Sequence, residues 1–269
     1  MELFKRFLKR KNKKKIGLAL GGGGAKGAVH LGALRAFEEE NIRFDMIAGT
    51  SIGSIVGALY AKGFSFREIE QVLSGCGLDD VKRLVIARLG GSNIDEIIEK
   101  ATGKMDFSDL KIPFCAVTVD MENGEEADIK EGNLITAVGA SCAIPPFFKP
   151  VTIDGKKFVD GAYMNIVPCD VVKNMGADFV VGIDLSGNRT SNAISKKPLD
   201  DKYPGNGVPF CNPSEKGYLA CDYMICPDLN DFSATSFGEI GRMFDLGYFA
   251  AKSAMQEIKT KLKSKGFKL

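Results

Sequence analysis

The 269-residue chain contains almost no histidine, since His30 is the only one. Its seven cysteines form an odd set without a C-x-x-C pair, so neither a disulfide framework nor a zinc site is indicated, and no metal is expected. The sequence also lacks a run of 18 apolar residues and the apolar core of a secretory signal. These absences predict a cytoplasmic protein that neither spans a membrane nor is exported.

Basic charge is concentrated in residues 1–15. The net charge of +2 hides this, because the arm holds eight Lys or Arg and one Glu while the remainder holds 28 basic and 33 acidic residues. Within the arm, Leu3, Phe4, Phe7 and Leu8 lie among cations at helical spacing. Two interpretations stand: a peripheral anchor on the anionic inner surface of a membrane, or a frayed, solvated tail. No nucleic-acid partner is expected.

From residue 16 onward, patterns of strands and helices alternate, and 45% hydrophobic content is ample for a core. Strands are expected at 16–20, 45–48, 112–120, within 151–160 and at 179–185, and helices at 28–41, 54–62, 133–141 and 239–262. Such alternation predicts a single α/β domain over 16–269 with a largely parallel sheet. Residues 64–110 are expected to form a cap over a site, and residues 186–220, rich in Gly and Pro, a long loop or insertion.

The first strand runs into a glycine-rich loop that opens a helix. Backbone N–H groups of such a loop bind anions, either a phosphate or a developing oxyanion. Gly22, Gly24 and Gly27 also match the dinucleotide-binding fingerprint, with Asp45 near the place of a ribose-binding acid. A Walker A loop is excluded, because Lys26 is followed by glycine and not by Ser or Thr.

The segment Gly49-Thr50-Ser51-Ile52-Gly53 is a G-x-S-x-G sequence between a short strand and a helix. This motif typically exposes a nucleophilic serine and relies on a histidine later in the chain. Here no histidine follows Ser51, so the base is sought among the acids. Asp160, on the turn Asp160-Gly161-Ala162 after a strand, is the candidate. Such an aspartate is usually a solvated loop residue, and only its combination with the other two motifs makes it a base.

These three motifs, in this order, resemble the patatin-like phospholipase family, whose members share a glycine-rich oxyanion loop, a G-x-S-x-G serine and a later D-G-[GA] aspartate. The resemblance extends to residues 110–114, 140–145, 165–168 and 175–178, and so covers most of the chain. It implies a patatin-like three-layer α/β/α fold with a largely parallel central sheet.

The resemblance also implies roles for individual residues. Ser51 would be the nucleophile and Asp160 its base in a dyad, with Gly49 and Gly53 shaping the elbow. The implied oxyanion donors are the amides of Gly22, Gly23 and Gly24, together with that of Ile52. Lys26 and Gly27 would support the loop, although many relatives have arginine at the position of Lys26 and glycine at that of Ala162. The implied substrates are phospholipids, lysophospholipids or neutral acyl esters, with no cofactor or metal.

An aspartate with a pKa near ~3.9 is a weak base at neutral pH, so Asp160 is expected to lie in a partly buried cleft. His30 is expected to pack near the loop without a catalytic role, and Cys142 with residues 145–148 to shape an apolar wall. Two alternatives stay open. One is a patatin-fold binding or regulatory protein with little or no hydrolase activity, and the other an NAD-type dehydrogenase built on the first strand, loop and helix.

Overall fold

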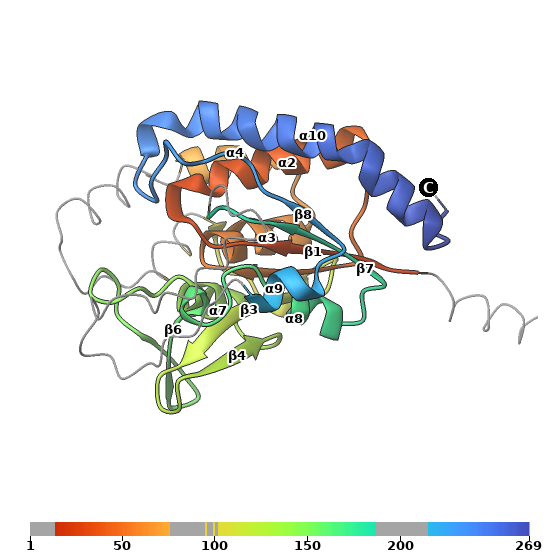
Figure 1. The fold of residues 1–269 in the computed structure, drawn as a ribbon. Helices are drawn as coiled ribbons and strands as arrows, with labels where there is room; N and C mark the ends of the chain where they lie inside the picture. Colours follow the sequence, from red (N-terminus) through yellow and green to blue (C-terminus); the bar gives the residue numbers. More distant parts are fainter. Residues whose placement is uncertain (1–13, 76–94, 96–98, 100–101, 187–214, 269) are drawn as a thin grey trace, which may run out of the picture.

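The computed structural model describes residues 14–75, 95, 99, 102–186 and 215–268 (Figure 1). The strands are β1 (Ile16–Leu20), β2 (Met46–Thr50), β3 (Phe114–Asp120), β4 (Glu125–Ile129), β5 (Val151–Ile153), β6 (Lys156–Asp160), β7 (Phe179–Ile183) and β8 (Tyr223–Ile225). The helices are α2 (Ala28–Glu39), α3 (Ile52–Lys62), α4 (Phe66–Gly75), α7 (Leu134–Ser141), α8 (Cys169–Asn174), α9 (Glu215–Ala220) and α10 (Ile240–Ser264). Short 3-10 turns are η1 (Gly24–Gly27), η2 (Phe107–Asp109), η3 (Gly161–Tyr163) and η4 (Phe237–Glu239).

All these strands join one mixed sheet in the order β5-β6-β3-β2-β1-β7-β8, and β4 also pairs with β3. The pairs from β3 through β8 along this order are parallel, whereas β3–β4, β3–β6 and β5–β6 are antiparallel. Every residue of β1, β2, β3 and β7 is buried, as expected of parallel strands covered on both faces. The predicted α/β fold with a largely parallel central sheet is therefore confirmed.

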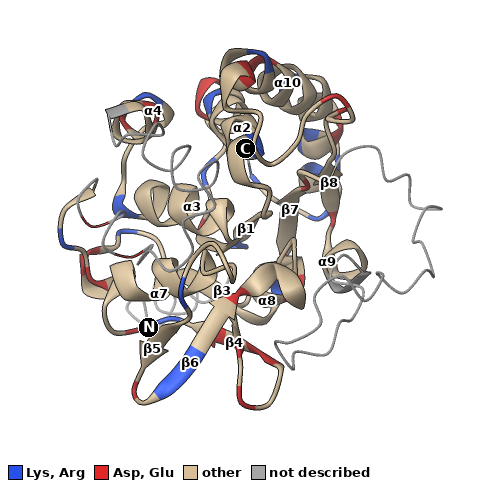
Figure 2. Ribbon diagram, turned by 90° about the vertical axis from the view of Figure 1, so that its left-hand side faces the viewer, with Lys and Arg blue, Asp and Glu red and all other residues tan. Residues whose placement is uncertain are grey.

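Helices cover both faces of the sheet, which makes three layers. Figures 1 and 2 show α10 and α2 on one side of β1 and β7, and α8 on the other. Successive residues of β1 follow this division: Leu18 and Leu20 enter the larger apolar core, whereas Ala19 enters a second core with Val171 and Val172 of α8. The strand is apolar throughout because both its faces are buried.

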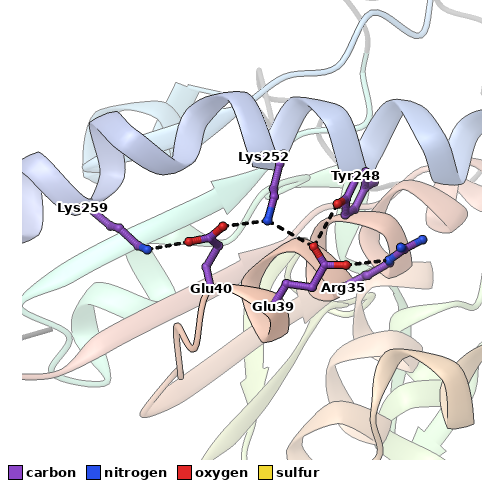
Figure 3. A network of polar contacts seen from close by, with 6 residues as sticks. All are labelled: Arg35, Glu39, Glu40, Tyr248, Lys252 and Lys259. Carbon is purple, nitrogen blue, oxygen red and sulfur yellow. Dashed lines mark hydrogen bonds and ion pairs between the residues drawn. The ribbon is translucent and has the colours of Figure 1, made fainter.

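The C-terminal helix α10 packs directly against α2. A Cβ at Gly32 would lie 2.0 Å from the Phe244 carbonyl oxygen, so the two backbones approach closely only because this residue is glycine. A network of polar contacts, drawn in Figure 3, also joins the helices. Within it, Lys252 and Lys259 donate to Glu40 at 2.7 and 2.6 Å and lower the pKa of that carboxyl to about 2. The network lies at the surface, so it adds little stability compared with the apolar contact.

The helix pattern over 239–262 and the first two strand–helix units are found close to their expected positions. Outside the segments expected to be a cap and a loop, the helices and strands that were not predicted are β4, α8 and β8. β4 carries Glu125, Glu126 and Asp128 (red in Figure 2) instead of an apolar pattern, and its position depends on backbone pairing to β3. The other two contain six and three residues, too few for a periodic pattern.

The predicted cap and loop fall largely outside the described residues. Within 64–110, α4 packs against α2, and the Phe66 amide donates to Glu38 at 3.0 Å. The rest of the cap stays a prediction, because 76–94 is not described. Within 186–220, the last residues form helix α9, which differs from the expected loop, and 187–214 again lies outside the described part. Among the described residues, no helix combines the length and apolar character that crossing a bilayer requires.

Candidate active site

Ser51 lies on a sharp turn between β2 and α3. Its backbone has φ 54° and ψ −126°, a conformation that residues other than glycine rarely adopt. The flanking glycines leave room for the turn: a Cβ at Gly49 would lie 2.3 Å from the Gly53 oxygen, and one at Gly53 2.2 Å from the Leu20 oxygen. The motif therefore has the strained strand–turn–helix geometry of a nucleophile elbow.

The register of β3 brings Ser51 and Asp160 together. β4 occupies one edge along the second half of β3, so β2 and β6 must share the other edge. On that edge β2 pairs as far as Thr50 opposite Val117, and β6 ends with Asp160 opposite Thr118. The two strands thus meet end to end, and the residue after Thr50 lies next to Asp160.

Asp160 is fully buried, more than the partly buried cleft that we expected. Its Oδ1 accepts the Ala162 amide at 2.8 Å, whereas Oδ2 has no hydrogen bond of normal geometry to any described residue. Burial raises the pKa of Asp160 to about 7, against the smaller lowering effects of the Ser51 hydroxyl and the Ala162 amide. The carboxyl beside the Ser51 hydroxyl therefore has a pKa near neutral pH, and hydrogen bonds between a nucleophile and its base can tighten when substrate binds.

The amide of Gly22 does not serve the predicted role of oxyanion donor, because it already donates to the Ile166 oxygen at 2.9 Å. Gly22 gives space instead: a Cβ there would lie 3.3 Å from the Ser51 Cβ. Gly23 and Gly24 lie at the start of η1, and Ile52 lies at the start of α3. Their amides therefore have no carbonyl acceptor within their own helices. In the described part of the chain they donate to no carbonyl outside those helices.

Contacts from several elements hold the glycine loop. The Lys26 ammonium donates to the Leu185 oxygen at 3.2 Å, and burial lowers its pKa while Asp184 opposes that shift. Gly27 packs on the start of α3, where a Cβ would lie 2.2 Å from Ile52 Cγ1. Lys26 and Gly27, for which a supporting role was predicted, thus contact Leu185 and Ile52 next to the glycine loop.

His30 is fully buried, with Nε2 placed 2.8 Å from the Gly21 oxygen. A carbonyl oxygen can only accept, so Nε2 carries the proton and the ring holds the first glycine of the loop. Burial lowers the pKa of His30 to about 4, so the ring is neutral at physiological pH. Its position agrees with the expected packing near the loop and not with a role as the base of Ser51.

The segment Ser141-Cys142-Ala143 contacts both Ser51 and Asp160, a role that the sequence did not indicate. The Ser141 Oγ accepts the Ser51 amide at 3.0 Å, and the Ala143 oxygen accepts the Asp160 amide at 2.9 Å. Cys142 is buried with its sulfur 3.8 Å from Ser54 Oγ, and burial raises the pKa of its thiol, so it packs and does not react. The available signals were the resemblance over residues 140–145 and a serine that ends a largely apolar helix.

The dehydrogenase alternative needs an acidic residue that can bind a ribose near the glycine loop, and Asp45 is not in that position. The Asp45 carboxylate accepts the Ile16 amide at 2.9 Å, so it lies at the start of β1, whereas the glycine loop lies at the opposite end of that strand. Asp45 therefore cannot reach a ribose bound at the loop. Among the residues that the structure describes, no cluster of three His, Cys, Asp or Glu could hold a metal ion.

Comparison with known proteins identifies the family of this chain. A family model described as "Patatin-like phospholipase" matches residues 18–173, so the chain belongs to this family, and the resemblance seen in the sequence is confirmed. Patatin-like phospholipase domain-containing protein 6 of Mus musculus is 28% identical over 277 residues, covering 88% of this chain and 20% of that protein. Lysophospholipase NTE1 of Mycosarcoma maydis is 30% identical over 292 residues, covering 92% of this chain and 15% of that protein.

The chain thus spans a fifth or less of the length of these two relatives. Among solved structures, VipD from Legionella pneumophila superposes with a TM-score of 0.59 at 14% identity, covering 91% of this chain and 67% of VipD. At that identity the likeness concerns the fold alone.

Proposed function

We propose that the protein is a serine acyl-ester hydrolase of phospholipase A or lysophospholipase type, with Ser51 and Asp160 as its dyad. The observation that carries this proposal is a strained serine next to a buried carboxylate whose pKa is raised to about 7. Membership of the patatin-like phospholipase family supports it. The raised pKa matters because a base works best when its pKa lies near the working pH.

In the first half of the reaction, the Ser51 oxygen attacks the ester carbonyl while ionised Asp160 takes the hydroxyl proton. Negative charge develops on the carbonyl oxygen, and in this proposal the amides of Gly23, Gly24 and Ile52 donate to it. Protonated Asp160 then returns the proton to the leaving alcohol. The products of this half are a free alcohol and an acyl ester on Ser51.

In the second half, water attacks the acyl carbonyl and gives one proton to Asp160. The same amides stabilise the second oxyanion, and Asp160 returns the proton to the Ser51 oxygen as the fatty acid leaves. Every atom comes from the ester, water or these side chains. The scheme therefore uses no cofactor and no residue in the usual position of a catalytic histidine.

The experiment that tests this proposal is intact-mass analysis after exposure to a fluorophosphonate, which phosphonylates an activated serine and releases fluoride. Wild type should gain one adduct, Ser51→Ala none, and Asp160→Asn one at a strongly reduced rate. Ser264→Ala, which changes an exposed hydroxyl at the end of α10, is the matched control and should label like wild type. No adduct and no ester hydrolysis by wild type would favour the binding or regulatory alternative.

We also propose that the basic arm, residues 1–15, contacts anionic membrane surfaces during hydrolysis of lipid. Residues 1–13 lie outside the described part of the structure, so the support is their charge and apolar spacing. Deleting residues 1–13 should weaken binding to vesicles containing phosphatidylserine and leave hydrolysis of a soluble ester unchanged. Equal vesicle binding by both proteins would support the solvated-tail interpretation.

A further inference from the structure

The hydrogen-bond ladder between β2 and β3 predicts a partner for the Ser51 amide. The Ile47 amide donates to the Pro113 oxygen at 3.0 Å, and Ile47 lies opposite Phe114 in this parallel pair. Amides that face one edge of a strand repeat every second residue, so the register extends this pattern to the Ser51 amide and the Val117 oxygen. A direct bond between these two groups would keep Ser51 within the strand.

The hydroxyl of Ser141 stands between these two groups instead. The Ser51 amide donates to Ser141 Oγ at 3.0 Å, and Ser141 Oγ donates to the Val117 oxygen at 2.6 Å. Ser141 is the last residue of α7, and none of it is exposed. One ladder bond is therefore replaced by two bonds through a hydroxyl, which separates β2 from β3 where the elbow turns away.

The same end of α7 also holds the backbone of the base. The Ala143 oxygen accepts the Asp160 amide at 2.9 Å. Asp160 lies opposite Thr118, the position that Ser51 would take if β2 continued for one more residue in register. The segment 141–143 therefore contacts both backbones at the point where two strands compete for the same place on β3.

We infer that Ser141 is a positioning residue, whose hydroxyl holds the strained Ser51 backbone so that the Ser51 oxygen faces Asp160. This inference rests on the proposed function. Without the hydroxyl, the Ser51 amide and the Val117 oxygen are both buried without a partner. The elbow can then satisfy them only by moving, either toward a direct ladder bond or away from β3. Each movement shifts the nucleophile relative to its base.

The main comparison of the test is between wild type, Ser141→Ala and Val138→Ala. Val138 lies on the same helix and is buried, so its truncation loosens α7 while the Ser141 hydroxyl stays. The measurements are the rate constant of fluorophosphonate labelling, kcat and KM for a soluble ester, and thermal stability. Because a displacement of about 1 Å can cost about 100-fold in rate, Ser141→Ala should slow labelling and lower kcat about 10- to 100-fold with KM unchanged.

The pH profile is a readout that a purely structural role would not change. The Ser51 hydroxyl lowers the pKa of Asp160 in the folded protein, so its displacement should move the midpoint of the labelling profile upward. Ser141→Cys retains a weaker donor and acceptor, and its rate should fall between those of wild type and Ser141→Ala. This second variant keeps the test decisive if Ser141→Ala folds poorly.

The outcomes separate the inference from the proposed function. If wild type takes no label, the proposed function is contradicted, and the inference falls with it. If wild type labels and folded Ser141→Ala labels at the same rate with the same midpoint, only the inference is overturned. If Val138→Ala slows labelling as much as Ser141→Ala does, stability and not position explains the loss, and the inference is again overturned.

Discussion

Replacing Asp160 with asparagine should make the protein more stable at alkaline pH while impairing catalysis. Asp160 is fully buried and its pKa is raised to about 7, whereas an aspartate in the unfolded chain has a pKa near ~3.9. At pH values between these two pKa values, Asp160 stays protonated in the folded protein but is ionised in the unfolded chain. Stability of wild type therefore falls as pH rises through this window, since ionised Asp160 is tolerated better in the unfolded state.

The size of the effect follows from the shift. About three pKa units at 1.36 kcal/mol each amount to about 4 kcal/mol of destabilisation once both states are ionised. Asparagine carries no proton to lose, and its side-chain oxygen can still accept the Ala162 amide. The difference in unfolding free energy, Asp160→Asn minus wild type, should therefore widen by about 3 kcal/mol between pH 5 and pH 8. Above pH 8 it should level off.

The assay is urea denaturation at pH 5, 6, 7 and 8, followed by circular dichroism because the chain contains no tryptophan. All other titrating groups are common to both proteins and cancel in the difference. Asp154→Asn, in the exposed turn between β5 and β6, is the control for exchanging a carboxyl for an amide. A stability difference that stays constant from pH 5 to pH 8, or that shrinks as pH rises, would refute the reasoning. Fluorophosphonate labelling of wild type should rise over the same window, with a midpoint near pH 7.

Three further predictions concern the elbow and the loop. Ser51→Gly should abolish labelling yet raise the unfolding free energy by about 1 kcal/mol, because glycine accepts φ of 54° more readily; an unchanged denaturation midpoint would contradict the strain. Gly53→Ala should lower stability by about 2 kcal/mol or more, measured by the same denaturation, since its Cβ would lie 2.2 Å from the Leu20 oxygen. Because the chain has a single histidine, ¹⁵N NMR can follow its ring directly. His30 should stay neutral, with the proton on Nε2, from pH 8 to about pH 5. Protonation near pH 6.5 would show that His30 is not buried as described.

The strand–helix units around the site were predictable because their signals are local. A short apolar run ending in glycines indicates a buried strand and a tight turn, as in β1 with its loop and β2 with Ser51. The glycines at 49 and 53 carry information for the same reason, since a side chain at either place would collide with the backbone. Elements without such a pattern were missed, and β4 is the clearest case because pairing to β3, not apolar periodicity, determines it.

Distances between separate segments were not predictable from the sequence. The Gly22 amide illustrates this, because the motif makes it a donor for an oxyanion, but its hydrogen bond goes to Ile166, which is 144 positions away. Ser141 illustrates it too, since nothing in its helix indicates that its hydroxyl interrupts the β2–β3 ladder. A hydrogen bond depends on tenths of an ångström, and sequence spacing carries no such precision across unrelated elements.

The sequence by itself determined which two groups we propose to react, because G-x-S-x-G and Asp-Gly-Ala indicate tight turns and the scarcity of histidine leaves an acid as the candidate base. Only the tertiary structure decided that these groups meet. β2 and β6 share one edge of β3, and because both strands end at the same place on that edge, Ser51 lies beside Asp160. Burial at that place, created by the packed layers, raises the pKa of the carboxyl to about 7, because a charge excluded from water is costly wherever its residue stands in the chain.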